Sequence, residues 1–175
     1  MSRPSRRAAL TAAAMELVER HGVHGLTYEA LAAHTGSSRS GVLYHFPSKE
    51  AMVEAVQEAA FEQWDRRAQA HLAADFEQVT AAERALAYIH ATVDEQETYA
   101  ATRYQSLVHS EFADAVWHRM RSRWIDTTPG VLDTATHVAV LAAEGLWLDY
   151  GPYRRLDPHT RAAIIEAITT GKDLP

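Results

Sequence analysis

The sequence contains no cysteine, and it has only six prolines and eight glycines in 175 residues. Without cysteine there is no disulfide scaffold, thiolate zinc site, iron–sulfur cluster or cysteine nucleophile. The longest uninterrupted apolar run, residues 138–143, has six residues, whereas a transmembrane helix needs about 20. Near the N-terminus, Glu16, Glu19 and Arg20 interrupt any signal-peptide core. We therefore predict a cytoplasmic protein with no membrane partner.

Charge is unevenly distributed along the chain, which carries a formal net charge of −6. Residues 1–50 contain six basic and four acidic side chains, whereas the rest contains 11 basic and 19 acidic ones. A basic head on an acidic body is typical of a chain whose one end binds a polyanion, although so small an imbalance also arises by chance. Arg3, Arg6 and Arg7 could reach phosphates or a minor groove as a flexible arm, or form a solvated tail.

Apolar residues recur at helical spacing through almost the whole chain, and no stretch reads convincingly as a strand. Thr27, Ser38 and Ser48 are good N-caps, whereas Gly22 and Gly36 are expected to end helices. The sequence therefore predicts an all-α fold of about nine helices in two parts, residues 1–50 and 51–175. The predicted helices cover residues 4–21, 27–34, 38–45, 48–71, 80–94, 98–109, 111–125, 131–150 and 157–170.

Two short helices separated by Gly36 lie within residues 27–49, which is the layout of a helix-turn-helix motif. The first turn of the second helix carries small or polar residues, where a recognition helix presents side chains to base edges. The hydroxyl, imidazole and ammonium groups that follow suit phosphate oxygens. The alternative is that all of them are solvated residues on two surface helices. The predicted DNA-binding residues are Thr27, Tyr28, Glu29, Ser38, Arg39, Ser40, Gly41, Tyr44, His45 and Lys49.

A set of short segments lies within residues 1–60: His21-Gly22, Gly25-Leu26-Thr27, Leu31-Ala32, Gly36, Ser38-Arg39 and the run LYHFPSKE at residues 43–50. This set resembles the DNA-binding head of the tetracycline-repressor-like (TetR) family of bacterial transcriptional regulators. The resemblance implies an all-helical homodimer that binds palindromic operators in double-stranded DNA. It also implies a three-helix head joined by the fourth helix to a body that binds a small-molecule effector and forms the dimer. The body matches weakly, mainly through the segment EGLWL at residues 144–148, which is similar to the penultimate helix of one common branch of the family.

Three residues depart from the pattern of the family. Ser37 follows the turn glycine where many members have an apolar residue, and Ser40 stands where glycine or alanine is common. Gly41 occupies a position that often supplies a base-contacting side chain. We therefore expect direct readout to depend on Arg39 and Ser40, and on Glu29, whose carboxylate could accept a hydrogen bond from a cytosine amino group.

The helix predicted over residues 131–150 is apolar nearly all round, so it needs cover on two sides. One side can face its own domain. The other side, with Ile164, Ile165 and Ile168 of the last helix, can meet the same surface of a second copy across a two-fold axis. A buried hairpin within a monomer is the alternative to this predicted homodimer.

Aromatic residues are concentrated between the head and this interface, together with a few polar side chains. An aromatic-lined cavity suits a planar or partly apolar molecule, although aromatics at helical spacing more often form plain core. Arg103 is the only candidate counter-charge on that stretch for a ligand carboxylate. We therefore expect an apolar or aromatic effector. Its predicted contacts are Trp64, Tyr88, Tyr104, His109 and Trp117.

Ten histidines raise the question of a metal site or an enzyme. His90 and Asp94 have i, i+4 spacing on one predicted helix, and either they or a second such pair, Asp114 and His118, could share one side of a metal ion. Ordinary ion pairs explain both pairs more simply, and the sequence has no phosphate-binding glycine loop or nucleophile elbow. We therefore predict a ligand-responsive repressor without catalytic activity, cofactor or metal. A metal-sensing regulator is the alternative, and a helical enzyme is a more remote one.

Overall fold

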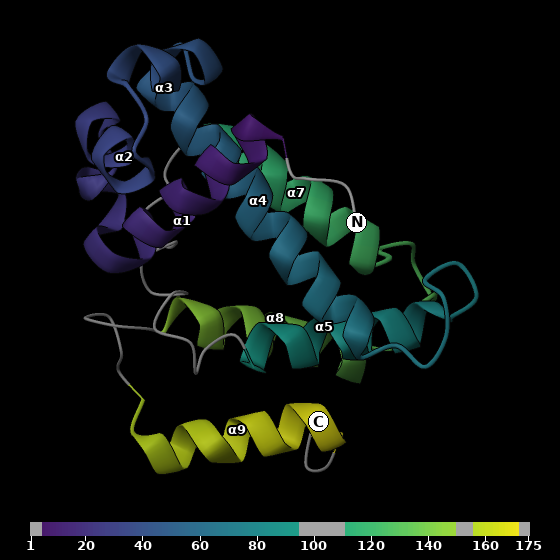
Figure 1. Cartoon of the computed structure of the whole chain (residues 1–175). Coiled ribbons are helices and arrows are strands. Elements are labelled where there is room, and N and C mark those ends of the chain that lie inside the picture. The colour runs from purple at the N-terminus through teal and green to yellow at the C-terminus, as the bar shows by residue number, and fades with distance from the viewer. Residues whose placement is uncertain (1–4, 95–110, 150–155, 172–175) are drawn as a thin grey trace. The chain divides into compact units, whose positions relative to one another are not determined.

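The computed structural model describes residues 5–94, 111–149 and 156–171 (Figure 1). These ranges contain eight helices and no strand, and none of the helices is long and apolar enough to cross a membrane. The predicted all-α class is confirmed, while the helix predicted over residues 98–109 lies outside the described residues. The chain divides into two compact units. The described residues of the first unit are 5–63 and 111–117, and those of the second are 64–94, 118–149 and 156–171.

The first unit begins with three helices, α1 (Arg6–Gly25), α2 (Tyr28–Thr35) and α3 (Arg39–His45). Gly22, predicted to end the first helix, has φ 69° and ψ 178°, so the helix is broken there. Helical backbone then resumes as far as Gly25. The predicted end at residue 21 is therefore too early, because a break at a single glycine does not prevent helix from forming again beyond it.

Side-chain caps fix the starts of α2 and α3 as predicted. The Thr27 hydroxyl accepts a hydrogen bond from the Ala30 N–H at 3.1 Å. The Ser38 hydroxyl accepts one from the Gly41 N–H at 3.0 Å. Each bond satisfies an N–H group that has no partner inside its helix, which is worth about 1 kcal/mol. Gly36 ends α2 in the left-handed region, with φ 63° and ψ 23°, and so turns the chain into α3.

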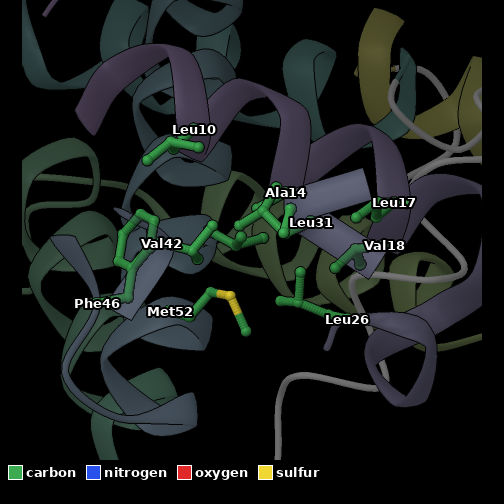
Figure 2. Close-up of a cluster of buried hydrophobic side chains, with 11 residues drawn as sticks. Leu10, Ala14, Leu17, Val18, Leu26, Leu31, Val42, Phe46 and Met52 are labelled. Atoms are coloured by element: carbon green, nitrogen blue, oxygen red, sulfur yellow. The ribbon is translucent and has the colours of Figure 1, made fainter. Parts of the chain in front are cut away.

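Side chains from α1, α2, α3 and the first turns of α4 (Lys49–Ala70) meet in one apolar cluster (Figure 2). Full burial of a valine- or leucine-sized side chain contributes about 1.5–3 kcal/mol. Because helices as short as α2 and α3 are marginal in isolation, this cluster is what holds them in place. Its buried members are Leu10, Ala14, Leu17, Val18, Leu26, Leu31, Ala32, Val42, Phe46, Met52 and Val56.

The second unit contains the end of α4, the end of α7 (Glu111–Trp124), and three further helices. These are α5 (Ala81–Asp94), α8 (Thr134–Leu148) and α9 (Pro158–Thr170), which pack against one another. The predicted limits of the fourth, fifth, seventh and last helices agree with the structure to within one residue at each end.

α8 begins at Thr134, three residues later than predicted. Asp133 is its N-cap, and the carboxylate accepts a hydrogen bond from the Thr136 N–H at 2.7 Å. Aspartate is more favourable at this capping position than inside a helix. The apolar residues Val131 and Leu132 therefore belong to the preceding turn and not to the helix.

α9 is held on the end of α8 by a buried arginine that the sequence analysis did not single out. Arg161 is only 7% exposed. Its Nη2 donates to the Leu146 carbonyl at 3.2 Å, and its Nη1 donates to the Asp149 carbonyl at 3.3 Å. Both carbonyls lie at the C-terminal end of α8, where positive charge is favourable, and the Leu146 carbonyl also accepts the Asp149 N–H at 3.1 Å.

Substituting Gly36 tests whether its backbone geometry sets the turn between α2 and α3. No atom lies within 4 Å of a Cβ added at Gly36, so strain would arise from φ 63° alone. We expect Gly36→Val to lower the free energy of unfolding by about 1–2 kcal/mol, as measured by urea denaturation. Gly36→Asn is the control and should retain more stability, because asparagine enters the left-handed region more readily. Equal stability of the two variants would contradict this assignment.

Candidate nucleic-acid interface

α3 has one face in the core and another exposed to solvent. Val42 and Phe46 are completely buried and lie one helical turn apart. Ser40 and Tyr44 have the same spacing but are exposed, with 85% of Tyr44 accessible. Arg39 is also exposed at the first residue of the helix. We call Arg39, Ser40 and Tyr44 the outer edge of α3.

Three of the predicted DNA-binding residues have a side-chain polar atom bonded to a backbone group of another residue. The hydroxyls of Thr27 and Ser38 are the caps described above. The Tyr28 hydroxyl donates to the Phe46 carbonyl at 3.0 Å and so joins α2 to the end of α3. In the structure these three side chains position the two helices.

Arg39 and Glu29 form an ion pair across the turn, with 2.7 Å between Nε of Arg39 and Oε1 of Glu29. The guanidinium also lies over the Tyr28 ring, 5.7 Å from its centroid. The pKa of the Glu29 carboxyl lies below its usual value, first because its own backbone N–H bonds to the carboxylate and then because Arg39 does. Glu29 is therefore ionised at neutral pH.

The three remaining predicted residues, Gly41, His45 and Lys49, differ in exposure. Gly41 is half-buried, and a Cβ there would lie 3.2 Å from the Ser38 hydroxyl, so a side chain would crowd the cap. This contact gives a physical reason for glycine at that position. His45 is half-buried against the Tyr44 ring, and Lys49 is exposed at the first residue of α4.

Arg6 and Arg7 are neither a free arm nor a solvated tail, because both lie in the first turn of α1. Arg6 Nη2 donates to the Ser37 hydroxyl at 2.7 Å, and Arg7 Nη1 donates to the His45 carbonyl. The two arginines thus fasten α1 to the turn and to the end of α3. Sequence patterns could not show these bonds, since they join residues 31 and 38 positions apart. Arg3 lies outside the described residues.

Two predicted effector contacts, Trp64 and Tyr88, lie together in the second unit. Both are buried, and their ring centroids are 5.2 Å apart. The buried Trp124 ring lies 5.8 Å from Trp64, and Phe76 lies 4.9 Å from Trp124. All three contacts are edge-to-face, the arrangement typical of packed aromatic cores.

The remaining predicted effector contacts are Trp117, Tyr104 and His109. Trp117 is half-buried and belongs to the first unit, while Tyr104 and His109 lie outside the described residues. A polar cleft of about 290 Å³ occurs in the second unit, but neither Trp64 nor Tyr88 lines it. Its lining residues are Arg84, Ser122, Arg123, Ile125, Asp126 and Thr127.

A polar network connects α5, α7 and α8 beside the aromatic core. The Tyr88 hydroxyl and Arg121 Nε both donate to Oε1 of Glu144, at 2.9 and 2.8 Å. Burial, followed by the charge of Glu144, raises the pKa of the Tyr88 hydroxyl far above its usual range. The hydroxyl therefore remains a donor at any physiological pH. Two donors and partial exposure offset the cost of placing the Glu144 carboxyl group at this position.

The predicted metal-binding pairs receive no support from the described residues. Asp94 is the expected partner of His90, but its Oδ2 lies 3.2 Å from Nε2 of His71. The His71 ring stacks on the His90 ring. The Asp114 side chain is outside the described ones, so its pairing with His118 stays a prediction. No three candidate metal ligands come together within the part of the chain that the structure describes.

The N-terminal helices define the class of protein. Two short helices meet at a tight glycine turn, and the second keeps an apolar base in the core while it exposes a polar edge. This is the architecture of a helix-turn-helix DNA-binding domain.

Comparison with known proteins relates the N-terminal helices to a family of DNA-binding domains. Residues 10–56 match the model for bacterial regulatory proteins of the tetR family. None of the curated proteins compared matches the chain. The first unit therefore contains a domain that matches the tetR family of bacterial regulatory proteins.

Solved structures share the fold over nearly the whole chain. A putative transcriptional regulator from Pseudomonas aeruginosa PAO1 is 22% identical, with a TM-score of 0.61 over 95% of this chain and 89% of that one. The ketosteroid transcriptional regulator KstR2 of Mycobacterium tuberculosis is 18% identical, with a TM-score of 0.59 over 97% and 96%. The multidrug binding protein EbrR, solved in complex with malachite green, is 18% identical, with a TM-score of 0.65 over 95% and 98%.

Removing the Tyr88 hydroxyl tests the polar network. We expect Tyr88→Phe to lower the free energy of unfolding by about 1–2 kcal/mol, because Glu144 then loses one of its two donors. Thermal or urea denaturation measures the change. Tyr44→Phe is the matched control, since the same atom is removed from an exposed ring, and should change stability by less than about 0.5 kcal/mol. An equal loss in both variants would contradict the assignment.

Proposed function

We propose that the protein is a homodimeric repressor that binds a palindromic operator through α2 and α3 and is released by a small effector. The outer edge of α3 is the observation that carries this proposal. We assign residues 1–50 to DNA binding and residues 51–175 to ligand binding and dimerisation. The protein acts in the bacterial cytoplasm, where its operator is found.

On the operator, α3 lies in the major groove with its outer edge toward the bases. Arg39 and Ser40, at the start of the helix, meet base edges, as the first residues of a recognition helix do. Tyr44, His45 and Lys49 meet phosphate oxygens, and the bonds from Thr27, Tyr28 and Ser38 hold the two helices in register.

The proposed dimer is formed by α8 and α9. Leu141 of α8 is 60% exposed and Val131 just before the helix is 43% exposed, although both are large apolar side chains. On α9, Ile164 and Ile165 are half-buried. Apolar side chains left accessible along neighbouring helices support a surface that a second copy covers.

The effector is proposed to be apolar or aromatic, with Trp64, Tyr88, Tyr104, His109 and Trp117 as its contacts. The solved complex of EbrR with malachite green supports an aromatic ligand for a protein of this fold. Because Trp64 and Tyr88 are buried in aromatic packing, a ligand reaches them only by separating those rings. α4 contributes residues to both units, so a shift at its end alters the population of DNA-binding states.

Selection of bound fragments from a random DNA pool tests the proposed function. We expect a palindromic consensus whose half-site centres are about 10 base pairs, roughly 34–36 Å, or a multiple of that apart, because two recognition helices related by a two-fold axis enter grooves on one side of the duplex. A consensus with a single half-site would contradict the dimeric model. Enrichment of no sequence would contradict operator binding altogether.

Light scattering tests the proposed dimer. We expect about twice the chain mass of 19.5 kDa at micromolar concentration. Leu141→Glu should shift the protein toward monomer, because two carboxylates would be buried across the axis. Leu86→Glu is the matched control: Leu86 is 44% exposed on α5, so the same change there should leave the dimer intact. A wild-type mass near that of one chain would contradict the proposal.

A further inference from the structure

We propose that Glu29 is a positioning residue for Arg39, and that this pair makes the protein select guanine at one position of each operator half-site. The inference rests on the proposed operator binding and deepens it. It concerns which base is chosen and which residue outside α3 makes that choice possible.

The structure restrains the Arg39 guanidinium on two sides before any DNA is bound. Nε of Arg39 donates a hydrogen bond to Oε1 of Glu29, a residue of α2, at 2.7 Å. The central carbon of the guanidinium lies 5.7 Å from the centroid of the Tyr28 ring. Tyr28 is itself fixed by its bond to the Phe46 carbonyl. A long side chain restrained in advance loses less conformational freedom when it binds, so its contact with one base becomes more selective.

The position of this ion pair determines which donors Arg39 can offer. Because Glu29 occupies Nε, the two terminal nitrogens Nη1 and Nη2 remain, and neither has a partner among the described residues. Two N–H donors side by side match the O6 and N7 acceptors of guanine in the major groove. Adenine offers one acceptor beside a donor, and cytosine offers a donor, so neither base satisfies both nitrogens.

The negative charge of Glu29 opposes DNA binding, so the effect of Glu29 on affinity can be measured separately from its effect on base specificity. Its side chain is 69% exposed and ionised on the surface that meets DNA, where a negative charge opposes the phosphates. Removing the charge should therefore raise affinity for any DNA. If Glu29 positions Arg39, the same change should reduce discrimination among bases, and these two effects have opposite consequences for specific binding.

The test is a double-mutant cycle on the palindrome selected by the wild-type protein. Fluorescence anisotropy at one salt concentration gives dissociation constants for wild type, Glu29→Gln, Arg39→Ala and the double variant. Each is measured on the selected operator, on operators with each guanine replaced in turn, and on random DNA. We expect wild type to prefer guanine at one position by about 5- to 150-fold per half-site, and Arg39→Ala to lose that preference.

Glu29→Gln should reduce the guanine preference by about 2- to 10-fold while affinity for random DNA stays equal or rises. In the Arg39→Ala background, Glu29→Gln should have no further effect on base preference. Glu50→Gln is the matched control: it removes an exposed carboxylate of the same unit that has no bond to Arg39, and it should leave base preference unchanged.

Three results would overturn the inference. An unchanged guanine preference in Glu29→Gln shows that Arg39 needs no positioning. Additive losses in the cycle show that Glu29 reads a base directly, for example through a cytosine amino group. An unchanged preference in Arg39→Ala removes Arg39 from base readout. In all three cases the wild-type palindrome still stands, so failure of this inference is distinct from failure of the proposed function.

Discussion

Burial of Val42 and Phe46 is the constraint on which the DNA-binding head depends. α3 has only seven residues, so its own hydrogen bonds cannot hold it in a defined orientation. Val42 and Phe46 lie one turn apart and both insert into the apolar cluster, which fixes the side of α3 that faces the core. That orientation exposes Arg39, Ser40 and Tyr44 together. Packing in the core of the first unit therefore determines which side chains α3 exposes to solvent.

Some polar side chains in the head bond to backbone groups and position the helices, whereas others are exposed to solvent. Thr27 and Ser38 cap helices, and Tyr28 bonds to the end of α3, so their polar atoms already have partners within the fold. Arg39 and Glu29 differ, because they pair with each other on the surface while most of each side chain stays exposed. A paired but accessible arginine is restrained without being withdrawn from DNA.

Polar groups that join helices of the second unit are more deeply buried than the Arg39–Glu29 pair of the head. Glu144 accepts from Tyr88 and Arg121, which belong to two other helices, and Arg161 of α9 donates to carbonyls at the end of α8. Buried polar groups are costly without partners, so these networks favour one arrangement of the helices over others that would bury as much apolar area. The Glu144 network includes Tyr88, whose ring packs on Trp64, so it borders the proposed effector contacts.

The sequence alone determined the helical class and the ends of α2, α3 and α9, because caps such as Thr27 and turn glycines such as Gly36 act on neighbours three or four residues away. It also identified the segment at residues 43–50 that carries the family resemblance, which the match over residues 10–56 confirms. Only the tertiary structure decided that Arg6 and Arg7 fasten the head, that Glu29 pairs with Arg39, and that Trp64 and Tyr88 pack as core. Those contacts join residues 10 to 38 positions apart, and which distant side chains meet depends on how whole helices pack, not on local spacing.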